Sequence, residues 1–343
     1  MLAPTDLPPL LGESRPFLEV LEQVSRIAPL DRPVLVIGER GTGKELIASR
    51  LHFLSQRWDR PFVKLNCAAL PESLLETELF GHEAGAFTGA ARRRAGRFEL
   101  ADRGTLFLDE IAGATLSVQE KILRAVEYGE FERVGGDASL RVDVRVVGAT
   151  NVDLPAVAEE GRFRQDLLDR LSFDVVTLPP LRARRDDVPV LTAHFGRAMA
   201  IELGWDGFPG FTDAATEALS DYPWPGNVRE LKNVVERAVC RGEPGAPVGE
   251  VVFDPFGSPY RPAGPQGQGG EPAATAAPVS AGEPMVPDAS YPMDLRETLA
   301  GIERGMLAAA LAANRYNQRA TADHLGLSYH QLRNSLRKHG LLG

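Results

Sequence analysis

The distribution of apolar residues predicts an α/β fold for the first half of the chain. Short apolar runs alternate with stretches whose apolar residues recur every three to four positions, the period of a helix packed on one face. Because the runs are almost continuously apolar, they indicate strands buried on both faces of a mainly parallel sheet. Strands that alternate with helices predict a layered architecture. The predicted strands are Val34–Ile37, Phe62–Leu65, Thr105–Leu108, Val144–Gly148 and Phe173–Leu178.

The pattern changes twice further along the chain. Strand signals stop near residue 180, and helical periodicity alone continues, as in Asp187–Leu203 and Asn227–Val239. A stretch rich in Pro, Gly, Ala and Ser then lacks apolar periodicity, which predicts a flexible linker. The predicted organisation is an α/β domain over 1–180, a helical subdomain over 181–241, a linker over 242–293 and a C-terminal domain over 294–343.

The last fifty residues predict a helix-turn-helix. Leu295–Asn314 and Asn317–Leu325 have helical patterns, and the turn Gly326–Ser328 offers a serine to cap a third helix, Tyr329–His339. A basic helix after a glycine-containing turn is typical of a DNA-binding module, although an amphipathic helix with a solvated charged face is the alternative. The residues expected to face DNA are Tyr329, His330, Arg333, Asn334, Arg337 and Lys338.

Charge supports this division of the chain. The 343 residues carry a net charge of −9, which argues against a protein that coats nucleic acid non-specifically. Between Asp294 and Gly343, however, the chain has four acidic and seven basic residues. A basic end on an acidic body favours a tethered DNA-binding module.

Composition also restricts the compartment. The longest apolar runs are too short to cross a bilayer, and residues 1–9 lack the basic and apolar regions of a secretory signal. Two cysteines, Cys67 and Cys240, are far apart, which argues against a disulfide framework or a cysteine zinc site, so we expect two reduced and mostly buried thiols. These observations favour a cytoplasmic protein without membrane insertion.

A glycine-rich segment after the first predicted strand has the context of a phosphate-binding loop. It precedes a predicted helix, Glu45–Leu54, so backbone N–H groups, the helix N-terminus and one lysine could surround phosphates. A plain strand–turn–helix is the alternative, and a glutamate stands where Ser or Thr usually ligates Mg²⁺. The predicted ATP-binding residues of the loop are Gly38, Glu39, Arg40, Gly41, Thr42, Gly43, Lys44 and Glu45.

A pair of acids strengthens this interpretation. Asp109 and Glu110 follow the strand Thr105–Leu108, at the strand end where parallel sheets bind ligands. Asp109 would hold the Mg²⁺ of a nucleotide and Glu110 would polarise the attacking water. The alternative is that the two acids only begin a helix predicted over Ala112–Ala125. Both motifs together predict a nucleoside triphosphatase.

A third motif lies between these two. Gly85, Ala86, Phe87, Thr88, Gly89 and Ala90 follow Glu78–Ala84, and two glycines frame an exposed tip that carries an aromatic ring. This segment resembles the GAFTGA loop of σ54-dependent transcription activators, which implies a contact with σ54. The resemblance further implies an AAA+ P-loop sheet with a helical lid and a Fis-type helix-turn-helix. Glu45 also matches that family, which leaves a magnesium role for this residue open.

The same resemblance implies roles for other polar residues. Asn66 would contact the glutamate of the acidic pair, Thr150 and Asn151 would form the sensor I motif, and Arg229 would point at the nucleotide from the lid. The resemblance also implies that Arg133–Gly136 lies where the family has its second substrate-facing loop.

Two arginines are implied to act in trans. Arg164 and Arg170 would reach the nucleotide of a neighbouring subunit, which makes a homo-oligomeric ring, by family a hexamer, a requirement for hydrolysis. The alternative for each arginine is a surface ion pair worth about 0–1 kcal/mol.

Control is expected to come from outside the chain. The α/β region starts near Leu10, so we expect no receiver or sensor domain before it. Phe17–Val24 and Leu54–Trp58 resemble most the subgroup that activates phage-shock-protein operons. That implies an inhibitory partner, the A protein of the operon, binding near Trp58, although a partly buried Trp at a helix end is equally compatible with the sequence.

The motifs together predict an activator that binds upstream DNA and hydrolyses ATP to remodel σ54–RNA polymerase. A protein unfoldase or a helicase loader is the first alternative, and the Gly85–Ala90 loop argues against both. A DNA-binding repressor with a decayed ATPase is the second, and intact Lys44, Asp109 and Glu110 argue against it.

Overall fold

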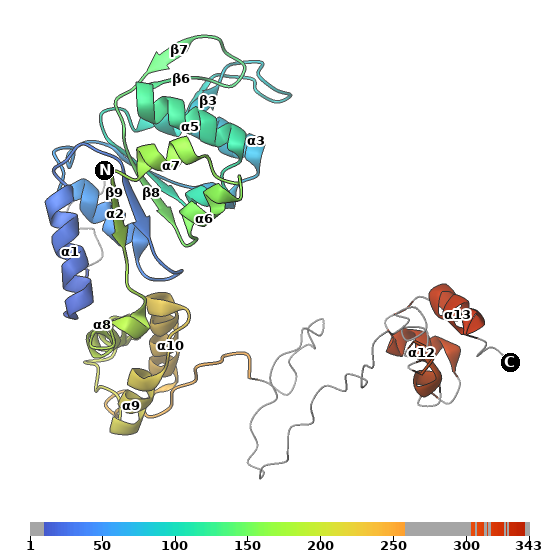
Figure 1. Ribbon diagram of the computed structural model, residues 1–343. Coiled ribbons are helices and arrows are strands. Elements are labelled where there is room, and N and C mark those ends of the chain that lie inside the picture. Colours follow the sequence, from blue (N-terminus) through green and yellow to red (C-terminus); the bar gives the residue numbers. More distant parts are fainter. Residues whose placement is uncertain are drawn as a thin grey trace, which may run out of the picture. The chain divides into compact units, whose positions relative to one another are not determined.

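The computed structural model describes residues 10–257 and, near the C-terminus, residues 303–305, 307–311, 314, 317–325, 327 and 329–339. The chain divides into two compact units, Met1–Pro262 and Ala263–Gly343, shown in Figure 1. Within the described residues, no helix is long and apolar enough to span a membrane.

A five-stranded parallel sheet forms the centre of the first unit. Its strand order is β2-β5-β8-β1-β9, and every neighbouring pair is parallel. All five predicted strands are confirmed, four of them with ends that differ by one or two residues. The central strands β1, β5 and β8 are largely buried on both faces, whereas the edge strands β2 and β9 keep exposed residues. The strands are β1 (Val34–Ile37), β2 (Phe62–Asn66), β5 (Thr105–Asp109), β8 (Arg145–Thr150) and β9 (Asp174–Thr177).

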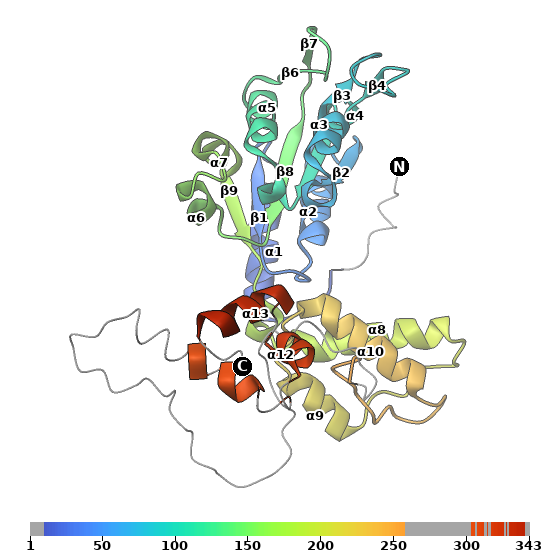
Figure 2. The same cartoon turned by 90° about the vertical axis from the view of Figure 1, so that its right-hand side faces the viewer.

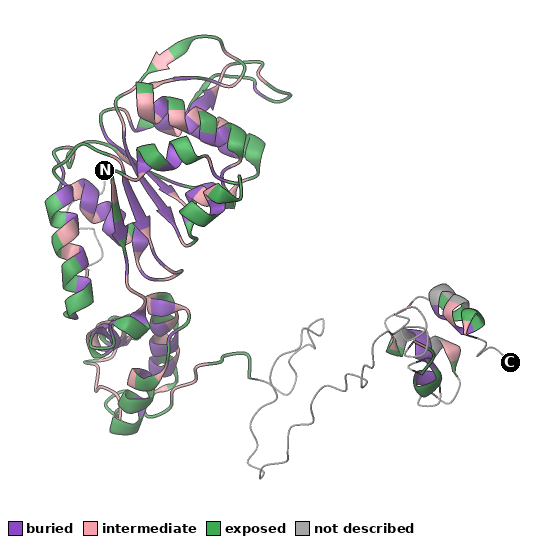
Figure 3. Cartoon of the chain, in the orientation of Figure 1, coloured by how far each residue is buried: buried purple, intermediate pink, exposed green. Residues whose placement is uncertain are grey.

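Helices cover both faces of this sheet. On one face, α1 and α2 contribute Val24, Ile47 and Leu51 to a core that includes Phe107. On the other, α3, α5 and α7 pack their leucines and isoleucines on Leu106 and its neighbours. Figures 2 and 3 show the resulting three layers with buried strands between them. The helices are α1 (Arg15–Ile27), α2 (Lys44–Phe53), α3 (Glu72–Phe80), α4 (Arg97–Leu100), α5 (Leu116–Tyr128), α6 (Leu154–Glu159) and α7 (Gln165–Leu171).

One predicted helix begins later than expected. The sequence predicted a helix from Ala112, but Ile111–Gly113 forms a 3-10 turn, η3, and α5 starts only at Leu116 after the N-cap Thr115. Glu110 has a left-handed backbone with φ of 50°, so the chain turns sharply as it leaves β5. The two acids therefore do not simply open a helix.

Two small hairpins project from one end of the sheet (Figure 2). β3 (Gly81–His82) pairs with β4 (Arg94–Ala95), and β6 (Glu130–Glu132) pairs with β7 (Ser139–Arg141), both antiparallel. The Gly85–Ala90 segment lies between the strands of the first hairpin.

The lid follows β9 and is helical, as predicted. It consists of the 3-10 turn η4 (Leu181–Ala183), α8 (Asp187–Glu202), α9 (Asp213–Asp221) and α10 (Asn227–Arg241), packed around the buried Trp224.

The predicted start of the linker at residue 242 is too early. Val248 is 3% exposed within the lid core, and the Phe253 ring stacks on Tyr222 with a centroid distance of 4.2 Å. Although the segment that contains Val248 and Phe253 is rich in Pro and Gly, it packs against the lid core. Of the predicted linker, residues 258–293 lie outside the described residues.

The second unit contains α12 (Gln318–His324) and α13 (Tyr329–Lys338), with helical residues at 303–305 and 307–311. Its small core contains Leu307, Leu311, Ala322, Leu332 and Leu336. The first part of the predicted helix Leu295–Asn314 lies outside the described residues. In the first unit Cys67 is buried as expected, whereas Cys240 is exposed, contrary to expectation.

Candidate functional site

The carboxyl ends of four neighbouring strands meet at one edge of the sheet. β2 ends at Asn66, β5 at Asp109 and β8 at Thr150, and the glycine-rich loop begins directly after β1. The register places Asn66 beside Asp109. Residues that are up to about a hundred positions apart in sequence therefore line one edge, the place where parallel sheets bind ligands.

The glycine-rich loop turns tightly between β1 and α2. Gly41 and Gly43 have left-handed φ angles of 79° and 101°, and α2 begins at Lys44. A Cβ on Gly41 would lie 2.3 Å from the carbonyl oxygen of Gly226, so only glycine fits. Because the loop ends at a helix N-terminus, its free N–H groups can surround an anion.

Lys44 lies over this loop. Its Nζ donates to the carbonyl oxygens of Gly38 at 2.8 Å and Glu39 at 3.2 Å, and the residue is 8% exposed. Burial lowers the pKa of Lys44, while the charges of Glu110 and Asp109 raise it. The lysine and the two acids thus form one electrostatic group at the edge of the sheet.

The acidic pair offers a site for a divalent cation with few protein ligands. Asp109 Oδ1 accepts a hydrogen bond from the backbone N–H of Glu110 at 3.0 Å. Among the described residues, no group of three or more His, Cys, Asp or Glu side chains could enclose a metal. One carboxylate beside a phosphate-binding loop suits Mg²⁺, which keeps water ligands and binds the phosphates of a nucleotide.

Asn66 contacts Asp109 and not the predicted Glu110. Its Nδ2 lies 3.5 Å from Asp109 Oδ2, whereas the prediction named Glu110. Its Oδ1 accepts hydrogen bonds from the backbone N–H groups of Ala68 at 2.9 Å and Ala69 at 3.1 Å, capping the 3-10 turn η2 (Cys67–Ala69). The cap holds the amide beside the neighbouring strand, where β2 and β5 pair in register.

Thr150 is the last residue of β8, and Asn151 follows it directly. Thr150 is fully buried, its carbonyl accepts from the N–H of Gly38 at 3.2 Å, and its hydroxyl accepts from the N–H of Val152 at 3.2 Å. Asn151 is half-buried. This pair joins β8 to the start of the glycine-rich loop.

Three lid residues that sequence reasoning missed bind the loop. Arg182 and Asn227 donate to the Glu39 carboxylate, and Arg184 donates to the carbonyl of Thr42 at 3.2 Å. Arg229, which was predicted, lies two residues after Asn227, and the Cβ that Gly41 lacks would meet its Cβ at 3.1 Å. No local pattern marks the missed residues, because each acts across more than 140 positions.

An apolar cavity of about 90 Å³ lies where the loop, α1 and the lid meet. It was also missed, since its walls come from four distant segments. Apolar walls beside the phosphate-binding loop suit a flat aromatic base. The cavity is lined by Leu10, Leu11, Phe17, Thr42, Gly43, Leu46, Ile47, Leu178, Arg184, Leu191, His194, Phe195 and Val228.

Arg164 and Arg170 belong to a different surface, at α7. Arg164 forms a bidentate ion pair with Asp166, at 3.0 and 2.7 Å, and Arg170 pairs with Glu127 of α5. Neither arginine lines the cavity beside the glycine-rich loop. Both arginines therefore lie away from the nucleotide site of their own subunit. A role in trans requires this arrangement.

The Gly85–Ala90 segment is the tip of the β3–β4 hairpin. The N–H of Gly85 donates to the carbonyl of Ala90 at 2.8 Å, and the glycines at 85 and 89 have φ of 85° and 104°. Phe87 is 46% exposed, and its ring touches the His82 ring edge-on at 5.0 Å. A large apolar side chain held outside any core is suited to contact a partner.

A second loop supports the first. The N–H of Glu83 donates to the carbonyl of Val134 at 3.1 Å, and the N–H of Val134 donates to the carbonyl of Gly81 at 3.0 Å. Arg133, 5% exposed, pairs with Glu83 and Glu99. The base of the tip is thus held by ion pairs of the buried Arg133 with two partly buried glutamates, while the tip itself stays exposed.

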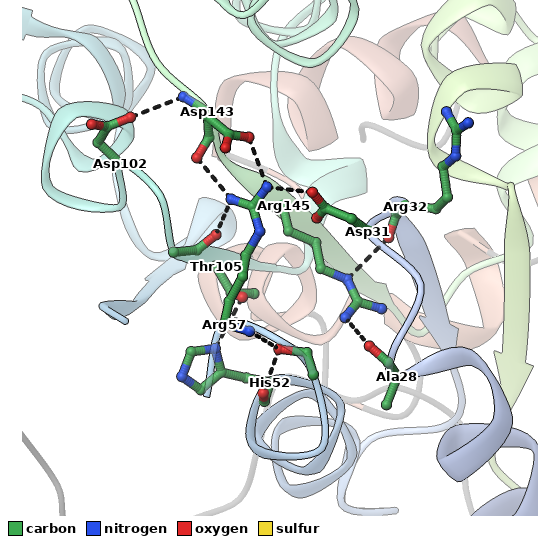
Figure 4. Close-up of polar contacts among 11 residues, drawn as sticks. Ala28, Asp31, Arg32, His52, Arg57, Asp102, Thr105, Asp143 and Arg145 are labelled. Carbon is green, nitrogen blue, oxygen red and sulfur yellow. Dashed lines mark hydrogen bonds and ion pairs between the residues drawn. The ribbon is translucent and has the colours of Figure 1, made fainter. Parts of the chain in front are cut away.

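Trp58 is 54% exposed, which decides between the two predicted states in favour of the exposed ring. The preceding residue, Arg57, donates to Asp31 at 2.5 Å and to Asp143 at 2.7 Å, as Figure 4 shows. It also donates to the carbonyl of Gly104 at 3.1 Å. The turn that carries Trp58 is therefore anchored to the amino-terminal ends of β5 and β8, opposite the phosphate-binding edge.

In the second unit, α13 has the predicted two-sided pattern. Leu332 and Leu336 are fully buried, whereas Arg333, Arg337 and Lys338 are exposed. Tyr329 is 39% exposed, and the side chains of His330 and Asn334 lie outside the described residues. The described bases on α13 thus face away from the core, as a helix that binds DNA requires.

Comparisons with known proteins identify the family of each part of the chain. The sigma-54 interaction domain family matches residues 10–177, the AAA+ ATPase lid domain matches 182–247, and the Fis family of bacterial regulatory proteins matches 298–339. Over 331 residues the chain is 56% identical to the Psp operon transcriptional activator of Escherichia coli, covering 96% of this chain and 97% of that protein. The chain belongs to the σ54-dependent transcription activators. It is thus an AAA+ ATPase with a σ54-interaction domain and a Fis-type DNA-binding domain.

Two other similar proteins match nearly the whole of this chain but are longer than it. The chain is 43% identical to the anaerobic nitric oxide reductase transcription regulator NorR of Klebsiella pneumoniae, over 97% of this chain and 62% of that one. The crystal structure of NtrX from Brucella abortus in complex with ATP matches with a TM-score of 0.67 and 31% identity, over 97% of this chain and 70% of that one. The σ54-dependent activator described here thus shares its fold with a protein that binds ATP.

Proposed function

We propose that this σ54-dependent activator assembles into a hexameric ring, binds upstream promoter DNA through its C-terminal helix-turn-helix and uses ATP hydrolysis to remodel σ54–RNA polymerase. The single observation that supports this most is the position of Phe87. An exposed aromatic ring stands on a hairpin tip that is held at its base by ion pairs of the buried Arg133, within the domain that carries the nucleotide site. Such a tip can move with the domain and contact a partner.

We further propose a role for each residue at the nucleotide site. Lys44 and the loop amides would bind the phosphates, Asp109 would hold Mg²⁺, and Glu110 would polarise the attacking water. Mg²⁺ would neutralise the charge that develops on the phosphates. Asn66 would orient the Asp109 carboxylate, and Arg229 would contact the phosphates from the lid.

Arg164 and Arg170 would complete the site of the adjacent subunit. Each is held in an ion pair on its own subunit, with Asp166 and Glu127 respectively, until a neighbour's phosphate replaces that carboxylate. A trans-acting arginine of this kind is typically worth about 10³–10⁵ in rate.

The target and the regulator are proposed from the E. coli relative. We propose that the activator acts in the cytoplasm on a phage-shock-protein operon, and that the A protein of that operon inhibits it at the surface around Trp58. An exposed indole beside the exposed Arg60 suits a protein interface, where Trp is frequent among the residues that dominate binding energy.

Single-round transcription from a σ54 promoter tests the function. Wild type with ATP is expected to activate, Lys44→Ala is expected to fail because it loses the phosphate contact, and Glu19→Gln, a surface change on α1, serves as the control. Full activation by Lys44→Ala, or none by wild type, contradicts the proposal.

Inhibition has a separate test. Adding purified phage shock protein A is expected to lower the ATPase activity of wild type but not that of Trp58→Ala. Equal inhibition of both proteins would place the inhibitor elsewhere.

A further inference from the structure

Glu39, the second residue of the phosphate-binding loop, is held by two separate elements of the lid. Arg182, in the turn η4, forms a bidentate pair with its carboxylate, at 2.8 and 2.5 Å. Asn227, the first residue of α10, donates its Nδ2 to the same carboxylate at 3.0 Å. A bidentate guanidinium–carboxylate pair fixes direction as well as distance, so the lid is oriented and not merely attracted.

Asn227 joins three segments at one buried point. Its Oδ1 accepts from the N–H of Leu181 at 2.7 Å, and its Nδ2 also donates to the carbonyl of Arg40 at 3.0 Å. The residue is fully buried with a left-handed φ of 54°, a conformation that Asn tolerates better than most residues. The strained backbone is kept by hydrogen bonds that reach the loop, the turn and the helix together.

The position of these contacts affects the ATP site directly. The backbone of Gly226 packs against Gly41 closely enough to exclude a Cβ. Arg229 follows on the first turn of α10, and its charge acts on Lys44. Any shift of α10 relative to the loop therefore moves Arg229 relative to Gly41 and Lys44.

The carboxylate is available in charged form at all working pH values. Hydrogen bonds from Arg182 first, and from Asn227 second, lower the pKa of Glu39 to about 2. The pair is partly exposed, with side-chain exposures of 48% and 41%, so solvent screens part of its attraction.

We propose that Glu39 is a positioning residue, which couples the phosphate-binding loop to the lid through Arg182 and Asn227 and so sets the affinity for ATP. The inference rests on the proposed nucleotide site at Lys44. When this coupling is lost, the lid no longer fixes Arg229 or its side of the apolar cavity beside the loop. The affinity for ATP then falls more than the rate of hydrolysis.

The test is steady-state ATP hydrolysis by the full chain, with KM and kcat separated, together with calorimetric binding of ADP. Glu39→Gln and Arg182→Ala are each expected to raise KM and the Kd for ADP about tenfold, the size expected for one charge-assisted contact, with kcat changed much less. The double variant is expected to be no worse than the poorer single variant, because both changes remove the same pair.

Two matched controls accompany these variants. Glu19→Gln removes an exposed acid that pairs with Arg15, and Arg185→Ala removes an exposed arginine near Arg182 in the same segment. Both are expected to keep the wild-type KM. An unchanged KM in Glu39→Gln, even with a lowered thermal midpoint, overturns the inference, and so do additive effects in the double variant. Absence of ATP hydrolysis in wild type would instead contradict the proposed function.

Discussion

The side-chain amide of Asn66 lies 3.5 Å from the carboxylate of Asp109, at the end of two paired strands. The same side chain caps the turn η2 with its oxygen, so one residue both ends β2 and faces the acidic pair. Its two contacts can be separated by substitution, because an aspartate keeps the oxygen that caps the turn and replaces only the amide nitrogen.

Asn66→Asp is therefore expected to fold normally but to hydrolyse ATP at least tenfold more slowly, since a second carboxylate beside Asp109 repels the first and disturbs Mg²⁺ binding. Asn66→Ala loses the cap as well, which is expected to cost about 1 kcal/mol of stability. Thermal unfolding and ATPase rates measure the two effects separately. A wild-type rate in Asn66→Asp would show that the amide has no role in hydrolysis.

The surface of α7 predicts an active site shared between subunits. Lys44→Ala and Arg170→Ala are each expected to lack ATPase activity. In an equal mixture, about a quarter of the ring interfaces would join an intact loop to an intact arginine, so activity should return in part. The measurement is the ATPase rate against mixing ratio, with Arg162→Ala as the exposed-arginine control. If the mixed proteins co-assemble without recovering activity, Arg170 does not act in trans.

A buried histidine predicts the pH dependence of stability. His52 is 1% exposed, and its Nδ1 lies 2.9 Å from the Thr105 hydroxyl, as Figure 4 shows. Burial first, and the charge of Arg145 second, lower the pKa of His52 from 6.5 to about 4. Below pH 6.5 the unfolded chain takes up a proton that the folded chain refuses, so stability falls as the pH drops towards 4.

Relative to wild type, His52→Gln is expected to lose less stability between pH 7 and pH 4.5, by on the order of 2 kcal/mol. Chemical denaturation at several pH values measures this difference, and the variant keeps a group that can hydrogen-bond Thr105. Parallel stability curves for the two proteins would mean that His52 does not cause the pH dependence.

Local patterns predicted most of the sheet and the phosphate-binding loop. β1 and β5 are runs buried on both faces, and the glycine-rich loop lies between β1 and α2 as its sequence context predicted. The start of α5 was predicted too early because Ala114 and Thr115 have extended backbones, with ψ of 137° and 160°, and separate the turn η3 from the helix. The local signal for the true start is Thr115, since threonine is a favoured N-cap residue.

Tertiary packing decides what the sequence could not predict. Val248 and Phe253 return to the lid core from a segment whose Pro and Gly content indicated a linker. Arg182 and Asn227 reach Glu39 across more than 140 positions, so neither periodicity nor a motif marks the contact. The contact of Asn66 with Asp109, in place of Glu110, likewise depends on the register of β2 and β5.

The central claim is that the exposed tip couples hydrolysis to the polymerase. Phe87 contacts only His82 among the ring pairs of the described residues, and the glycines beside it have open space around them. Removal of the Phe87 ring should therefore leave the fold and the nucleotide site intact.

The most direct measurement compares ATP hydrolysis with σ54-dependent transcription in Phe87→Ala. The account predicts an ATPase rate within about threefold of wild type, since the ring lies outside the core, and loss of nearly all activated transcripts. Wild-type levels of transcription by Phe87→Ala would contradict it.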